Sequence, residues 1–178
     1  YIKWLGENGI PTIGTPGLAF YNLQYHLWRD LYFVATGNTS GTAGVIYALS
    51  SGIIHRCIIN MNNQTGQAGV QMGTQGGVID CEIYGGTTSP SNSANCYGVY
   101  LSSYGGLVQG CRIHHCREAG INVNYIAGGN TILNNLIYLC AGDGILTQVV
   151  NTVTSHIINN TIDANLGHGI YLAGTNGV

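Results

Sequence analysis

The stretch Ile157–Ile162 (Ile-Ile-Asn-Asn-Thr-Ile) decides the fold, because related six-residue stretches recur upstream. The other copies are Ile132–Ile137, Val108–Ile113, Val78–Ile83, Ile54–Ile59 and, more weakly, Leu27–Tyr32. Their fourth residues fall at positions 160, 135, 111, 81, 57 and 30, so successive copies lie 24 to 30 residues apart. Internal similarity at such a period predicts a solenoid, in which each repeat forms one coil of a stack.

A second element recurs at the same rhythm: a glycine followed by alternating apolar and variable residues. It begins at Gly17, Gly44, Gly69, Gly98, Gly120, Gly144 and Gly169. The alternation predicts a short strand with its apolar residues facing a core, and the glycine suits a turn with positive φ or a close backbone approach. In the first element, apolar residues at both ends require a bend between them. The pair Asn159-Asn160 tolerates the left-handed conformation of such a corner.

Three short strands per coil describe an all-β, right-handed parallel β-helix solenoid of about six coils, each of 22–30 residues. With its Ile-x-Asn-Asn-x-Ile and Gly-Ile-x-Leu motifs, the chain resembles the pectin-lyase-like parallel β-helix repeat proteins from about residue 17 onward. That superfamily contains lyases, hydrolases, epimerases, phage tailspikes and noncatalytic surface proteins. The resemblance therefore implies a fold, and the function has to be argued from a site.

Length and composition fit one domain with a substantial core. Of the 178 residues, 45% are hydrophobic and only 7% are charged, against about 25% charged residues in ordinary soluble domains. The net charge of −2 argues against nucleic acid, which requires a basic face. No apolar run approaches the ~18 residues of a membrane span.

The ends of the chain differ from the repeats. Residues 1–16 lack the repeated words and are expected to be an entry segment or the end of a preceding coil, and residues 17–178 form the β-helix. No capping helix is visible at either terminus. Because an open end exposes core and unpaired strand edges, we expect further copies, a partner or missing sequence to cover the ends.

The six cysteines fall mainly into two repeat columns. A structural ladder is expected at the corner of the first element, formed by Cys57, Cys81, Cys111, Asn135 and Asn160. Cys116 and Cys140 share a second column. We expect small, buried free thiols, with a Cys116–Cys140 disulfide as the alternative in an oxidising compartment. No Cys-x-x-Cys pair is present, so no metal site is expected.

One column of aromatic and polar residues is a candidate glycan-binding surface. It contains Tyr84, His114, Tyr138 and Asp163, preceded by Asn60. Aromatic faces stack on sugar rings while polar neighbours bond the hydroxyl groups. A solvated ladder without a ligand is the alternative interpretation of the same column.

Candidate catalytic residues are few. Asp143 and His168 each precede a strand-opening glycine, so they should lie on adjacent coils, as a general base and its orienting carboxylate do. His114 and Glu118 belong to the densest polar cluster, and Glu82 shares a column with Arg112. A structural contact between coils is the favoured interpretation of the Asp143–His168 pair and of the Glu82–Arg112 pair.

Two functions remain as hypotheses. The favoured one is a noncatalytic structural β-helix that is extracellular, on a cell surface or on a virion, with glycan binding along one sheet face as an additional role and no cofactor. Low charge and uncapped ends support it. The alternative, implied by the resemblance, is a polysaccharide lyase or glycoside hydrolase, which in the lyase case would use calcium held by clustered carboxylates.

Overall fold

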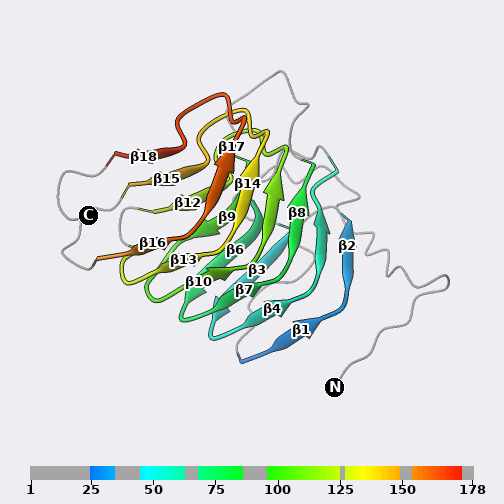
Figure 1. The fold of residues 1–178 in the computed structure, drawn as a ribbon. Coiled ribbons are helices and arrows are strands. Elements are labelled where there is room, and N and C mark those ends of the chain that lie inside the picture. The colour runs from blue at the N-terminus through cyan, green and yellow to red at the C-terminus, as the bar shows by residue number, and fades with distance from the viewer. Residues whose placement is uncertain are drawn as a thin grey trace.

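The computed structural model describes residues 25–34, 45–62, 68–85, 96–124, 127–148 and 154–173. These residues form eighteen short strands in three parallel sheets, and each sheet takes one strand from each of six successive coils. Figure 1 shows the coils stacked along one axis from the first labelled strand to the last. The all-β parallel solenoid predicted from the repeats is therefore confirmed.

The three sheets are named here in the order in which the chain enters them. The first sheet contains β1 (Leu27–Arg29), β4 (Ile53–His55), β7 (Gly77–Ile79), β10 (Leu107–Gln109), β13 (Thr131–Leu133) and β16 (His156–Ile158). The second sheet contains β2 (Tyr32–Val34), β5 (Ile58–Asn60), β8 (Glu82–Tyr84), β11 (Arg112–His114), β14 (Leu136–Tyr138) and β17 (Thr161–Asp163). The third sheet contains β3 (Ile46–Ser50), β6 (Ala68–Thr74), β9 (Tyr97–Leu101), β12 (Ile121–Val123), β15 (Ile145–Thr147) and β18 (Ile170–Leu172).

The register of the sheets follows the repeated words, with one exception. Ile132 pairs with Val108 on one side and with Ile157 on the other, as the repeat predicts. The weak first copy, however, is displaced by one residue, because Trp28 pairs with Ile54. Asp30 therefore does not belong to the Cys57 column in which the spacing placed it. The poor match of this copy to the repeated word allowed either alignment.

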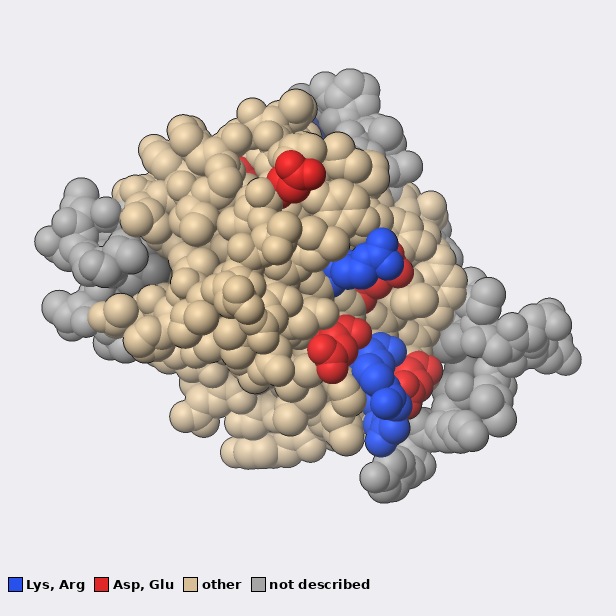
Figure 2. Space-filling model, viewed as in Figure 1, with Lys and Arg blue, Asp and Glu red and all other residues tan. Residues whose placement is uncertain are grey.

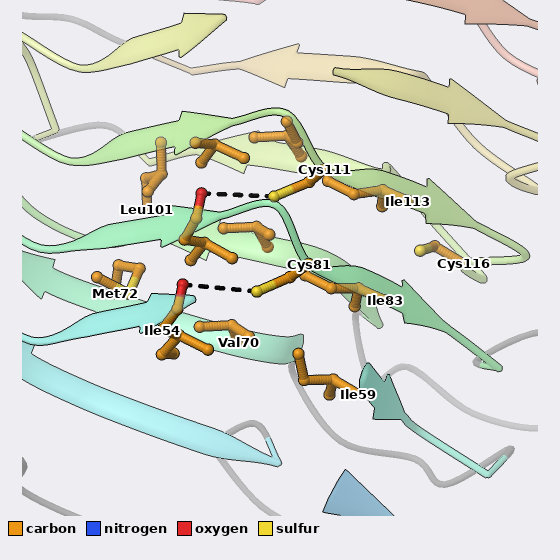
Figure 3. Close-up of a cluster of buried hydrophobic side chains, with 14 of the residues drawn as sticks. Ile54, Ile59, Val70, Met72, Cys81, Ile83, Leu101, Cys111, Ile113 and Cys116 are labelled. Atoms are coloured by element: carbon orange, nitrogen blue, oxygen red, sulfur yellow. Dashed lines mark hydrogen bonds between the residues drawn. The ribbon is translucent and has the colours of Figure 1, made fainter. Parts of the chain in front are cut away.

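The interior is filled by the middle residue of each strand in the first two sheets and by two alternate residues, such as Ile121 and Val123, from strands of the third sheet. Ile59, Ile83, Ile113 and Ile137 come from the second sheet and are fully buried. They pack with residues of the other two sheets, such as Ile54, Val70 and Leu101, in a single core cluster. Figure 3 shows these side chains converging from the different strands. Stacking of like residues at the spacing of about 4.8 Å between strands makes this core continuous along the axis.

The glycine at the start of four strands of the third sheet, β6, β9, β12 and β15, is required by a close approach to the next coil. A Cβ atom at Gly69 would lie 2.7 Å from a methyl group of Ile83 and 2.9 Å from the carbonyl oxygen of Gly98. Gly98, Gly120 and Gly144 meet the corresponding isoleucine and carbonyl oxygen of the next coil in the same way. Of the two reasons that the sequence offered for this glycine, close packing is the one that the structure supports.

The corner between the first and second sheets has a left-handed residue followed by a ladder residue. Positive φ angles occur in every coil at this corner, at Asp30, Arg56, Asp80, Gly110, Asn134 and Asn159. Of each Asn-Asn pair, the first residue thus supplies the bend. The second residue, as in Asn135, points inward and binds the backbone of the neighbouring coils.

Asn135 and Asn160 form hydrogen bonds between three successive coils. Asn135 Oδ1 accepts the N–H of Cys111 at 2.9 Å, and Asn135 Nδ2 donates to the carbonyl oxygen of Val108 and to Asn160 Oδ1, both at 2.9 Å. Asn160 Nδ2 likewise donates to the carbonyl oxygen of Ile132. The bond to the Cys111 N–H pairs a corner group outside the strands, and the bonds to Val108 and Ile132 tie the side chains to β10 and β13.

The three cysteines of the same column act as weaker members of the ladder. The thiols of Cys81 and Cys111 donate to the carbonyl oxygens of Ile54 and Val78, at 3.5 and 3.4 Å (Figure 3). Cys81 Sγ also accepts the N–H of Cys57 at 3.4 Å. The hydrogen bond with Cys111 and burial raise the pKa of Cys81 to about 12. The five residues of the predicted ladder lie on successive coils and are joined by these hydrogen bonds.

All six cysteines are free and buried, which agrees with the favoured expectation. Cys116 and Cys140 occupy the second predicted column without a disulfide. The hydrogen bond with Cys140 and complete burial raise the pKa of Cys116. Cys140 N–H donates to Asn165 Oδ1 at 2.9 Å, so an asparagine continues this column in the last coil.

The last described coil exposes apolar side chains that earlier coils bury or half-bury. Ile158, Ile170 and Leu172 are about half exposed, at 50%, 45% and 46%. Their coverage by a further layer of strands stays a prediction. The expected boundary between residues 1–16 and 17–178 lies outside the described residues. In the described part of the chain, no helix has the length and apolar character to cross a membrane.

Candidate functional site

The predicted column of aromatic and polar residues lies on the outer face of the second sheet. Asn60 pairs with Tyr84, Tyr84 with His114, His114 with Tyr138, and Tyr138 with Asp163. Each residue is the last of its strand, immediately before the corner that leads toward the third sheet. In-register parallel pairing therefore places the side chains one above another.

The rings of this column stack on each other. The His114 and Tyr84 rings are 5.2 Å apart at an interplanar angle of 4°, and the His114 and Tyr138 rings are 4.7 Å apart at 21°. Both faces of the imidazole and one face of each tyrosine are therefore in contact with a neighbouring ring. The hydroxyl groups at the ring edges contact polar neighbours, Tyr84 the hydroxyl of Tyr32 and Tyr138 the guanidinium of Arg112. A sugar would meet this column through hydrogen bonds to ring edges, where the sequence had suggested stacking on ring faces.

His114 is held by both of its ring nitrogens. Nε2 lies 3.2 Å from Glu82 Oε1, and Nδ1 lies 2.7 Å from Nδ1 of His115. The side chain of His114 is only 12% exposed. Burial lowers the pKa of His114 below its usual value, although the contact with Glu82 opposes this shift. The imidazole is therefore mostly neutral near pH 7.

Glu82 and Arg112 form the ion pair between adjacent coils that their common column predicted. Arg112 Nη1 lies 3.6 Å from Glu82 Oε1, and Nη2 donates to the Tyr138 hydroxyl at 3.3 Å. The guanidinium is 58% exposed, so the pair adds little to stability. Its main effect is to fix Arg112 along the edge of the ring stack.

The polar network continues toward the first coils. Asn60 Nδ2 donates to the Tyr32 hydroxyl at 3.2 Å, and the hydroxyl groups of Tyr32 and Tyr84 lie 3.5 Å apart. This hydroxyl contact raises the pKa of Tyr84 to about 12. We call the residues Tyr84, Glu82, Arg112, His114, His115 and Tyr138 the polar stripe.

Asp143 and His168 come together as predicted, away from the polar stripe. His168 Nδ1 lies 3.0 Å from Asp143 Oδ1, which also accepts the backbone N–H of His168 at 2.7 Å. The imidazole stacks on Tyr171 with the ring centroids 4.9 Å apart. His168 is 69% exposed. The pair has the geometry of an oriented base, and equally of a structural contact between coils.

Glu118 lies in the loop between β11 and β12, one coil before Asp143, and its backbone carbonyl oxygen accepts the N–H of Gly142 at 2.9 Å. Its charge, together with burial, raises the pKa of Tyr97. Within the described residues, no ion pair joins Glu118 to His114 or to His168. Of the four catalytic candidates, His114 lies in the polar stripe, whereas the backbone of Glu118 lies beside Gly142, next to the Asp143–His168 pair.

The outer face of the third sheet carries polar residues that the sequence analysis did not single out. Tyr100 pairs with Gln71 on one side and Asn122 on the other, and its ring stacks on Tyr97 at 5.7 Å. Gln71 Oε1 and Asn122 Oδ1 are buried without a hydrogen-bond partner. The sequence does indicate these positions: each is the third residue of the repeated motif that begins with glycine, and the alternation of a strand places that residue on the outer face.

A charged cluster occupies the corner between the first two sheets in the early coils. Arg56 contacts Asp30 on the coil below at 2.7 Å, and Arg29 contacts the same carboxylate at 2.9 Å. These contacts lower the pKa of Asp30 to about 2. Figure 2 shows acidic and basic side chains gathered together on one side of a mostly uncharged face. All three side chains are more than 40% exposed, so these ion pairs lie on the surface.

Calcium requires several oxygen ligands around one point. In the part of the chain that the structure describes, no three side chains of His, Cys, Asp or Glu are grouped to hold a metal ion.

Comparison with known proteins identifies the class to which the fold belongs. A family model described as "Right handed beta helix region" matches residues 43–178, which is more than half of the chain. The chain therefore belongs to the right-handed β-helix family. No curated protein and no solved structure matches it significantly.

Proposed function

We propose that this chain is a noncatalytic structural β-helix that acts outside the cell, on a cell surface or on a virion, and that binds a glycan through the polar stripe. The observation that carries the proposal is the stacked set Tyr84, His114 and Tyr138. It holds a line of hydrogen-bonding groups on the outer face of the second sheet.

Two properties of the polar stripe support binding of an extended sugar chain. First, donors and acceptors alternate along it, with the Arg112 guanidinium beside the Tyr138 hydroxyl and the Glu82 carboxylate. Sugar hydroxyl groups need both kinds of partner. Second, the rings are already fixed by their mutual contacts, so binding loses little side-chain entropy.

The test is calorimetric titration of the chain with two hexasaccharides, one neutral (cellohexaose) and one acidic (hexagalacturonate). We expect at least one to bind, and Arg112→Ala and Tyr138→Phe each to weaken that binding by about tenfold, the effect of losing one or two hydrogen bonds. Tyr171→Phe, on the third sheet, is the matched control and should bind normally. Equal binding by all variants would place the glycan elsewhere, and no binding of either sugar would remove this role.

A polysaccharide-active enzyme is the second candidate, because Asp143 fixes His168 through both its backbone and its ring. An oriented imidazole of this kind can act as a general base. The test is release of reducing ends or of unsaturated products from pectin, alginate and xylan. Activity that His168→Ala and Asp143→Asn abolish, and that Arg112→Ala leaves unchanged, would establish the enzyme and overturn the noncatalytic proposal.

A further inference from the structure

Two neighbouring imidazoles in the polar stripe face each other with the same type of nitrogen. His114 Nδ1 and His115 Nδ1 are 2.7 Å apart, and the two rings are nearly perpendicular at 78°. Two unprotonated nitrogens at this distance would repel each other. Either one Nδ1 therefore carries a hydrogen and donates it to the other, or both lone pairs are turned toward one metal ion.

The surroundings of His114 fix which of its nitrogens is available. Nε2 faces the Glu82 carboxylate at 3.2 Å, so this nitrogen carries the proton and Nδ1 presents a lone pair. A ring hydrogen-bonded to a carboxylate in this way is the usual arrangement of a metal-ligating histidine. The rings of Tyr84 and Tyr138 on its two faces hold the imidazole in this orientation.

His115 makes the position reachable from solvent. It is exposed, and it lies at the corner directly after β11 with a φ of 53°. This backbone conformation brings its ring back against His114. Leu139 and Ala164 have similar φ angles at the same corner of later coils, so the fold supplies the bend and the sequence supplies the second imidazole.

We propose that the Nδ1 atoms of His114 and His115 form a two-imidazole site for a divalent transition-metal ion, with Glu82 as the outer partner that orients His114. Two nitrogen ligands with the remaining positions open to water favour Cu²⁺, which heads the affinity order for such ligands, with Ni²⁺ and Zn²⁺ weaker. Metal–nitrogen bonds of about 2.0–2.1 Å require the rings to separate slightly, and the exposed His115 is free to turn. The site is independent of the glycan proposal.

Nearby charges act in both directions on this site. The Glu82 carboxylate favours a bound cation, while the Arg112 guanidinium, 3.6 Å from that carboxylate, opposes it. Replacement of Arg112 by alanine should therefore tighten metal binding, whereas the same variant should weaken glycan binding. The opposite signs separate the two proposals.

The experiment is titration of the intact chain with Cu²⁺ in a non-coordinating buffer, followed by calorimetry and by electron paramagnetic resonance. We expect one ion per chain with two nitrogen ligands. His115→Ala should weaken binding by at least about tenfold, and Glu82→Gln should weaken it by about tenfold, in the range found for outer partners of metal ligands. His168→Ala is the matched control, because it removes another exposed histidine that lies away from the two Nδ1 atoms, and it should bind normally.

Circular dichroism checks that each variant is folded, and His115→Ala changes only an exposed side chain. A second readout uses Zn²⁺ and the ¹⁵N chemical shifts of the imidazoles, in which both Nδ1 signals should move. Three results would overturn the proposal. These are the absence of stoichiometric Cu²⁺ binding at micromolar concentration, equal loss of binding in His168→Ala and His115→Ala, or ¹⁵N shifts confined to Nε2 atoms.

Discussion

Asn135 offers the sharpest test of the corner ladder, because its side chain bonds two buried backbone groups on neighbouring coils. Asn135 itself is 2% exposed. In Asn135→Ala the N–H of Cys111 loses its partner and the carbonyl oxygen of Val108, inside β10, loses one hydrogen bond, while the backbone N–H of residue 135 can still donate to Asn160 Oδ1. A buried group left unsatisfied costs about 1–3 kcal/mol, and one lost hydrogen bond costs about 0.5–1.5 kcal/mol. The expected loss of stability is therefore about 1.5–4.5 kcal/mol.

Asn135→Cys is the matched variant, because cysteine fills this column in three earlier coils. A thiol there donates to the same kind of carbonyl oxygen, as Cys111 does to Val78 at 3.4 Å, and sulfur can accept an N–H, as Cys81 does from Cys57. These bonds are longer and weaker than those of the amide. We expect Asn135→Cys to lose about 1–2 kcal/mol, less than Asn135→Ala.

Urea unfolding followed by circular dichroism measures both variants, with the slope of the transition checked for constancy. The predicted order of midpoints is wild type, then cysteine, then alanine. If the alanine variant unfolds at the wild-type midpoint, the ladder contributes nothing. If the cysteine variant is as unstable as the alanine variant, the thiols of this column do not replace the amide.

Three further predictions concern other positions. Gly120→Ala should destabilise the chain by about 1–3 kcal/mol by overpacking, because its Cβ would collide with Ile137. Gly169→Ala should be tolerated, because a Cβ there would make only an ordinary contact at 3.9 Å. Equal melting temperatures of the two variants would contradict the packing argument. Burial lowers the pKa of His114 in the folded chain. The stability that this neutral imidazole contributes is therefore complete above its unfolded pKa of about 6.5 and is lost as the pH falls toward the folded pKa. An NMR titration of His114 with a midpoint at or above about 6.5 would contradict this prediction. Cys81, whose pKa is raised to about 12, should react with a thiol reagent at pH 8 only after unfolding, and rapid labelling of the native chain would show that the corner is open.

Much of the fold could be read from the sequence because a parallel solenoid repeats the same contacts in every coil. Each column of like residues is therefore visible as a spacing, and the pairing of His114 with Tyr138 followed from the period alone. The first coil shows where this breaks down. With only a weak match to the repeated word, the spacing placed Asp30 beside Cys57, and the structure places Leu31 there, where its carbonyl accepts the N–H of Ile58.

The site was less predictable, because a column gives neighbours but no side-chain orientation. The period placed Tyr84, His114 and Tyr138 together, but it did not show that their ring faces are used up in mutual stacking. The pairing of His114 with Glu82 crosses two columns, so no spacing indicates it. The contact with His115 depends on a left-handed corner, which sequence alone does not assign to a histidine.

The same limit applies to the third sheet. Tyr97 and Tyr100 are three residues apart in one coil, and their contact arises from the way in which the chain enters β9. Alternation indicates that Tyr100 faces outward, but it does not reveal that Gln71 and Asn122 on either side are buried. Burial on an outer sheet face depends on what packs over it, and the repeat carries no information about that.

The proposal that the polar stripe binds a glycan is tested most directly by a residue-resolved titration. Adding cellohexaose or hexagalacturonate to ¹⁵N-labelled protein, with backbone amide shifts recorded at each step, should shift the signals of residues 112–115 and 136–139, with reducing ends unchanged after prolonged incubation. Shifts confined to residues 143–147 and 168–172, accompanied by cleavage of the oligosaccharide, would contradict the proposal and would place an active site at Asp143 and His168.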